Sequence, residues 1–143
     1  MGISKSLFDR LGGKPTLQRV HKVFYDKVYV HPWIGQYFTG TEQQILEDQQ
    51  TDFMISIMGG PKQYMGRPPK YAHQHMVITE ELFELRQQLL SESIQECGLS
   101  DELREEWLGT DNALRRALVK KSREECKAYT PEDILDFKNP AHG

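Results

Sequence analysis

Residues Gln49–Gln74 read QQTDFMISIMGGPKQYMGRPPKYAHQ, a stretch in which an amphipathic helix, a glycine break, an irregular loop and a histidine follow one another. Apolar residues recur at three- and four-residue spacing before the break, which predicts a helix over residues 42–58 with the stripe Leu46, Phe53, Met54 and Ile57. Residues 59–69 contain too much glycine and proline for regular structure, so only a short helical turn fits before Met76.

Gln50 interrupts the apolar stripe of this helix, four residues after Leu46 and four before Met54. A buried amide is costly unless it has a hydrogen-bond partner. We therefore expect that either another side chain or a group bound in the core supplies this partner.

The rest of the chain also has helical spacing, without a convincing alternation of apolar and polar residues, which predicts an all-α fold. Gly12–Gly13 is expected to end a short helix that begins near Ser6. Thr79 and Ser100 are typical N-cap residues at the starts of two later helices, the last of which should end near Lys120. We also expect a helical turn from residue 32 and a helix from residue 15 with the stripe Leu17, Val20, Phe24 and Val28.

A chain of 143 residues suits one domain, which we expect over residues 1–128, with a loosely packed or disordered tail over residues 129–143. With 18 Lys+Arg against 21 Asp+Glu there is no basic face, so nucleic acid is not an expected partner. No apolar run approaches the length of a membrane span, and neither Cys97 nor Cys126 belongs to a metal or haem-attachment motif. We expect a soluble, cytoplasmic protein, and we interpret the acylation pattern MGISKS at Gly2 as a chance match.

His73 and His75 raise the question of a metal site. In a helix, side chains two residues apart diverge by about 200°, so joint chelation of zinc is unfavourable. One alternative leaves both imidazoles on a surface turn. The other turns a single histidine inward as the axial ligand of a cofactor with its own equatorial donors, of which haem is the common case. Tyr25 and Gln50, polar residues on the apolar faces of two helices, favour the second alternative because a diatomic ligand in an apolar slot would use both.

Several blocks, taken in order, resemble the truncated haemoglobins, and most closely their group I branch. The resemblance runs from about Leu7 to Lys120. It rests on FDRLGG, VHKVFYDKVYVHPWIGQYF, the GT dipeptide, the stretch Gln49–Gln74 quoted above and ITEELF. It implies a two-over-two helical globin that holds haem b noncovalently.

The resemblance also implies roles for individual residues. His73, which follows Gly66, Pro68 and Lys70 at the family's spacing, matches the proximal iron ligand. Tyr25 and Gln50 match the hydrogen-bonding residues of the opposite, distal side. The matched positions that line the haem are Phe38, Leu46, Phe53, Met54, Tyr64, Ile78 and Phe83, and the cations expected near the propionates are Arg67 and Lys70.

Two details bear on the iron's coordination. His75 stands where group I members often have a glycine-rich step, so it remains a second candidate for the iron ligand. The distal helix carries Gln49 and no histidine that could close the sixth site, and His142 is the only histidine near the C-terminus. We therefore expect a five-coordinate iron and no covalent attachment.

The expected function is reversible oxygen binding stabilised by Tyr25 and Gln50, with conversion of nitric oxide to nitrate as an enzymatic use. That conversion needs an external reductase, because no reductase domain fits in the chain. The alternatives are a peroxidase-like or ligand-sensing haem protein and, in a different class, a haem-free helical interaction module.

Overall fold

The structure is a computed structural model that describes residues 5–62, 64 and 66–142, so Gly2 lies outside the described residues. Within these residues the chain is helical, and the only strand-like pairing is one isolated bridge between Met76 and Leu135. None of the described helices is long and apolar enough to cross a bilayer. The helices are α1 (Leu7–Leu11), α2 (Lys14–Val30), η1 (Ile34–Phe38), α3 (Gln43–Ile57), α4 (Pro69–Ala72), α5 (Glu80–Glu96), α6 (Asp101–Asn112), α7 (Arg115–Leu118), η2 (Arg123–Glu125), η3 (Pro131–Asp133) and η4 (Pro140–His142), where η marks a 3₁₀ helix.

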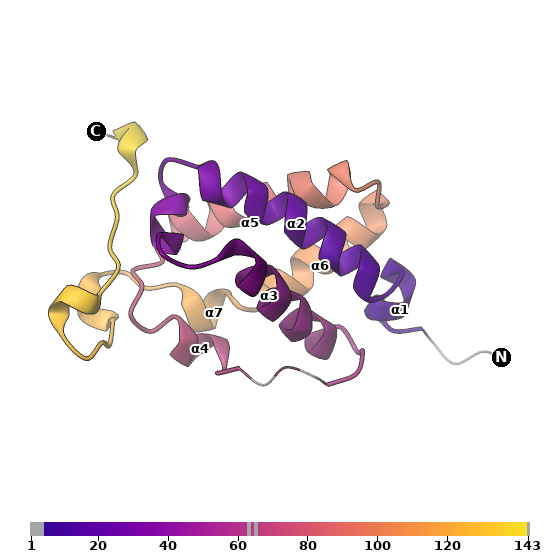
Figure 1. The fold of residues 1–143 in the computed structure, drawn as a ribbon, viewed down its shortest axis with the longest axis horizontal. Coiled ribbons are helices and arrows are strands. Elements are labelled where there is room, and N and C mark those ends of the chain that lie inside the picture. Colours follow the sequence, from indigo (N-terminus) through magenta and orange to yellow (C-terminus); the bar gives the residue numbers. More distant parts are fainter. Residues whose placement is uncertain (1–4, 63, 65, 143) are drawn as a thin grey trace.

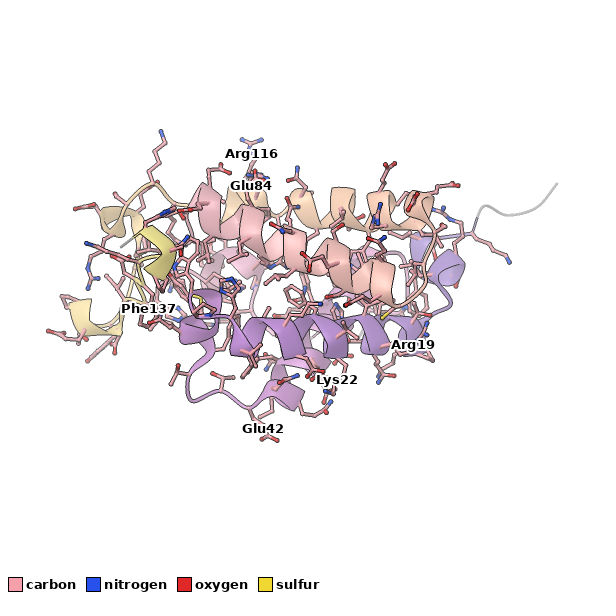
Figure 2. All side chains as sticks on the ribbon, turned by 90° about the horizontal axis from the view of Figure 1, so that it is seen from above. Arg19, Lys22, Glu42, Glu84, Arg116 and Phe137 are labelled. Carbon is pink, nitrogen blue, oxygen red and sulfur yellow. The ribbon has the colours of Figure 1, made fainter. Side chains whose placement is uncertain are left out.

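The long helices form two pairs that pack on each other (Figure 1). Helix α2 packs against α3, α5 packs against α6, and contact between α2 and α5 joins the pairs. Figure 2, seen from above, shows α2 and α5 running side by side along the molecule. The short helix α4 contacts α7. The all-α, two-over-two fold is therefore confirmed.

Most helix ends follow the sequence signals. Gly12 takes the left-handed conformation, with φ of 102°, and ends α1. The Thr79 hydroxyl accepts a hydrogen bond from Leu82 N, and the Ser100 hydroxyl accepts one from Leu103 N, both at 3.2 Å. These caps satisfy backbone donors that the first helical turn leaves free.

The expected last helix is wrong in one respect, because the chain breaks it at residues 113–114 into α6 and α7. The amide of Leu114 donates to Asp111 O at 3.0 Å, a three-residue bond that tightens the turn. This turn redirects the chain, and Leu118 is buried after it.

Helix α3 has two faces where the sequence predicted one stripe. Its buried face consists of Glu47, Thr51, Met54 and Ile55. Leu46, Gln50 and Phe53 lie on a second, half-buried face. Ile57 continues this second face by one turn and is 40% exposed, so its assignment to a buried stripe was wrong.

The C-terminal segment is pinned to the domain, against our expectation of a loose tail. Leu135 exchanges backbone hydrogen bonds with the segment that follows the histidines: its amide donates to His75 O and its carbonyl accepts from Val77 N, both at 2.8 Å. The indole of Trp33 donates to Phe137 O at 2.6 Å. Figure 2 shows Phe137 at this end of the molecule, where the tail meets the helices.

Phe137→Ala should lower the free energy of unfolding by about 1–3 kcal/mol, because it removes the edge-on contact between the pinned tail and Tyr37 of η1. The Phe137 ring lies 5.0 Å from the ring of Tyr37, which is buried. Tyr129→Ala is the matched control, since Tyr129 is 99% exposed in the same tail and its loss should change stability little. Equal denaturant midpoints for the two variants would show that the tail does not support the domain.

His21 is a polar side chain buried in the core between α2, α3 and α6. Its Nδ1 lies 2.7 Å from the Thr51 hydroxyl, and its ring packs edge-on against Trp107 at 5.7 Å between centroids. Its Nε2 has no hydrogen-bond partner among the described residues. Burial, followed by the positive charge of Arg86, lowers the pKa of His21 to about 3, while Asp111 opposes the shift. The folded protein therefore holds this imidazole neutral.

Because the folded pKa of His21 lies below its ordinary value of 6.5, the unfolded chain binds a proton on this residue first as the pH falls. The stabilisation is therefore complete above pH 6.5 and is lost progressively toward pH 3. Chemical unfolding followed by circular dichroism should show a shallower loss of stability over this range in His21→Leu than in the unsubstituted protein. An unchanged slope in His21→Leu would contradict the assignment of the pH dependence to this buried imidazole.

Candidate functional site

A cavity of about 520 Å³ lies between α2, η1, α3, α4, α5 and α7. Its volume falls within the range of about 300–1,000 Å³ that is usual for ligand and cofactor sites. The walls are mainly apolar and aromatic, with a few polar groups among them. The principal apolar lining residues are Phe24, Ile34, Phe38, Leu46, Phe53, Met76, Ile78, Leu82, Phe83, Leu114 and Leu118.

His73 lines the cavity from the C-terminal end of α4. Its Nδ1 lies 2.8 Å from the carbonyl oxygen of Pro69. Because a carbonyl oxygen can only accept, Nδ1 carries the proton, and Nε2 keeps a free lone pair. Burial is the main cause that lowers the pKa of His73 to about 4, so the imidazole is neutral at pH 7. A neutral imidazole with one oriented nitrogen is the form that ligates a metal.

His75 does not line the cavity, although it is only two residues away. Residues 73–75 form a turn after α4, so our premise that both histidines belong to a helix was wrong. The turn still separates the imidazoles, since only His73 reaches the cavity. Among the described residues there is no group of three or more His, Cys, Asp or Glu side chains that could hold a metal ion.

Tyr25 and Gln50 reach the same cavity from α2 and α3. Burial raises the pKa of Tyr25 to about 12, so its hydroxyl remains protonated and can donate. The Tyr25 ring is held edge-on by Phe24 at 4.9 Å and by Phe38 at 6.0 Å between centroids. Neither the Tyr25 hydroxyl nor the Gln50 amide has a hydrogen-bond partner within the described part of the chain, so both remain available to a bound species.

The other residues that the resemblance singled out fall into three groups. Those that line the cavity are Phe38, Leu46, Phe53, Tyr64, Ile78 and Phe83. Arg67 also lines it, from an exposed position at the rim. Met54 is fully buried in the helical core and Lys70 is exposed, and neither lines the cavity.

Arg86 is a cavity-lining residue that the sequence analysis missed. Its guanidinium pairs with the carboxylate of Asp111, at 2.6 Å from Nη1 and 2.8 Å from Nη2. Arg86 lies four residues after Leu82 and four before Leu90, within the apolar face of α5. The reasoning applied to Gln50 could therefore have found it.

The residues present fit the haem that the resemblance implies. The walls are apolar and aromatic, one neutral imidazole offers a free nitrogen, and Arg67 stands at the rim where carboxylates could reach it. His73 would hold the iron, while Tyr25 and Gln50 would face a ligand.

Comparisons with known proteins point to the same cofactor. The chain matches the model of the bacterial-like globin family over residues 6–120. It is 35% identical over 104 residues to the group 1 truncated haemoglobin GlbN of Mycolicibacterium paratuberculosis, which covers 73% of this chain and 76% of that protein. A group 1 truncated haemoglobin of Tetrahymena thermophila is 30% identical over 98 residues, with coverage of 68% and 81%.

Solved structures agree on the fold. Truncated haemoglobin from Tetrahymena pyriformis superposes with a TM-score of 0.75 and 24% identity, over 82% of this chain and 100% of that chain. The two-over-two haemoglobin from Synechococcus, solved with covalently attached haem, gives a TM-score of 0.70 and 26% identity over 80% and 98% of the two chains. The protein therefore belongs to the bacterial-like globins and, within them, to the group 1 truncated haemoglobins, a family that binds diatomic ligands at a haem.

Proposed function

We propose that this protein holds one haem b through His73 and binds oxygen reversibly on the opposite face, where Tyr25 and Gln50 donate hydrogen bonds to the ligand. One observation carries the proposal: a single cavity collects a free imidazole nitrogen from the turn after α4 and, from α2 and α3, two polar groups that have no hydrogen-bond partner among the described residues. The haem, when bound, supplies the iron to which the diatomic ligand attaches. The protein residues supply orientation, hydrogen bonds and exclusion of water.

His73 is prepared for its role before any cofactor binds. The hydrogen bond from Nδ1 to Pro69 O fixes both the tautomer and the rotation of the ring. The backbone around it is also held, because Lys120 Nζ donates to His73 O at 3.0 Å. Little conformational entropy is therefore lost when the nitrogen takes up a ligand position.

Tyr25 and Gln50 account for ligand retention in this proposal. Oxygen at a ferrous haem carries partial negative charge, which hydrogen-bond donors stabilise strongly where water is excluded. The raised pKa of Tyr25 keeps its hydroxyl a donor throughout the physiological range. We therefore expect slow oxygen release.

Arg67 and Lys70 are proposed as partners of the haem propionates. Both are exposed, so each ion pair should contribute about 0–1 kcal/mol to cofactor binding. The apolar walls should supply most of the affinity, because they remove the macrocycle from water.

Conversion of nitric oxide to nitrate is a second use of the same pocket. The two donors on one side of the cavity favour it, because the reaction requires oxygen that is retained long enough to meet nitric oxide. A bound haem would supply the electron for this oxidation, so a partner reductase would have to return one electron in each turnover.

The haem ligand is tested by adding hemin to purified protein and measuring the Soret absorption. We expect His73→Ala to lose the band at equal hemin concentrations, because no other imidazole of the described residues lines the cavity. His75→Ala is the matched control and should keep it. Loss of the band in His75→Ala alone would assign the iron ligand to His75 instead. A colourless unsubstituted protein would contradict the haem proposal.

Tyr25→Phe should speed oxygen dissociation by about tenfold or more, because it removes one donor from a buried, charge-bearing contact. Tyr29→Phe is the matched control on the same helix, since the Tyr29 hydroxyl donates to Thr41 O at 2.8 Å and Tyr29 does not line the cavity. The rates follow from stopped-flow displacement of oxygen by carbon monoxide. If Tyr25→Phe and Tyr29→Phe release oxygen at the same rate, the Tyr25 hydroxyl does not donate a hydrogen bond to the ligand.

A further inference from the structure

The cavity wall contains a buried ion pair that the proposed function does not use. Asp111 on α6 is fully buried, while 19% of the Arg86 side chain on α5 is exposed. Both terminal nitrogens of Arg86 donate to Asp111, at 2.6 and 2.8 Å. Gln87 Nε2 also approaches Asp111, at 3.5 Å.

The pair is oriented with its positive end toward the cavity. Arg86 lines the cavity, whereas Asp111 does not. A guanidinium has five N–H groups, of which the bidentate pair occupies two. The others have no partner among the residues that the structure describes, so they can donate to a molecule in the cavity.

Arg86 reaches the wall on the side of Tyr25. Its Cζ lies 5.9 Å from the centroid of the Phe24 ring, and the Phe24 ring packs against Tyr25 at 4.9 Å. The second ring beneath Arg86 is Phe83, whose centroid is 5.7 Å from Cζ. Among the charges that act on Tyr25, Arg86 has the largest influence and lowers the pKa of its hydroxyl against the stronger effect of burial.

Stability alone does not explain this pair. Replacing a buried ion pair by apolar residues of similar volume is often neutral or stabilising, because both charges must be removed from water. An arginine in a mainly apolar wall adds a further free-energy cost, because its remaining N–H groups are taken from water without a hydrogen-bond partner. A ligand that accepts hydrogen bonds from them would offset that cost.

We infer that Arg86, oriented by Asp111, is an anion-recognising group of the ligand pocket, which favours small monoanions such as fluoride and azide over neutral ligands at the haem. The inference rests on the proposed haem site and extends it to a ligand class. Charge-assisted hydrogen bonds from a guanidinium are stronger than neutral ones, and they strengthen further where water is excluded. Asp111 keeps the guanidinium in place, so no reorganisation is needed when the anion arrives.

The test measures equilibrium binding to the haem-loaded full chain. Dissociation constants of azide and fluoride are measured on the ferric protein and that of carbon monoxide on the ferrous protein, by titration of the Soret band. The main variant is Arg86→Leu with Asp111→Leu, which leaves no unpaired buried carboxylate. The matched control is Arg10→Leu with Glu106→Leu, a bidentate pair at 2.5 and 2.6 Å on the surface between α1 and α6.

We expect the main variant to raise both anion dissociation constants by about tenfold or more, with the carbon monoxide constant changed less than about threefold. The surface control should match the unsubstituted protein for all three ligands. Unchanged anion constants in the main variant overturn the inference, and so does an equal loss of affinity for anions and carbon monoxide. Weaker hemin uptake with unchanged anion constants also overturns it, because Arg86 would then serve a haem propionate.

If the main variant does not take up hemin, Arg86→Lys with Asp111 intact tests whether Arg86 recognises the anion. Its charge balance is preserved, but an ammonium cannot hold the bidentate geometry and also face the ligand. The azide constant should therefore rise by about threefold or more, and an unchanged constant overturns the inference. Absence of a Soret band in the unsubstituted protein would instead mark the failure of the proposed function.

Discussion

Keeping a large cavity open inside a short helical chain is the constraint on which the structure depends. A space of about 520 Å³ removes packing contacts from the centre of the domain. The cavity is held open by the α2, α3 and α5 contacts on one side and by a backbone clamp on the other. In that clamp the amides of Lys120, Lys127 and Leu135 donate to Ile78, Gln74 and His75, at 2.8, 2.7 and 2.8 Å. The segment that carries His73 is thereby fixed although it lies in a turn, and a ligand that fills the cavity should stabilise the fold further.

The polar groups near the cavity divide according to what they face. Tyr25 and Gln50 face inward and make no hydrogen bond to the described residues. Asp111 faces away from the cavity and is fully paired with Arg86. Arg86 connects the two environments, because it satisfies the buried carboxylate and keeps donors toward the cavity. This division is what a site requires when its ligand, rather than the protein, completes the hydrogen bonding.

Local signals in the sequence predicted much of this arrangement. Caps at Thr79 and Ser100 are properties of a few neighbouring residues, and the structure confirms them. Gln50 was identified as unusual because a polar residue on an apolar face has few explanations, and Arg86 is missing from the prediction only because the same test was not applied to α5. The pinned tail depends on backbone hydrogen bonds between residues about 60 apart, such as Leu135 to His75, which leave no side-chain pattern to read. The break between α6 and α7 is likewise not marked in the sequence, because residues 113–114 are neither glycine nor proline.

We expect His73, held by Pro69, to be the single protein ligand of a haem in this cavity. A crystal structure of the haem-loaded protein tests it most directly. In that structure His73 Nε2 should be bonded to iron, Nδ1 should keep its hydrogen bond to Pro69 O, and Tyr25 and Gln50 should lie on the opposite face. Ligation by His75, or a haem bound outside this cavity, would contradict it.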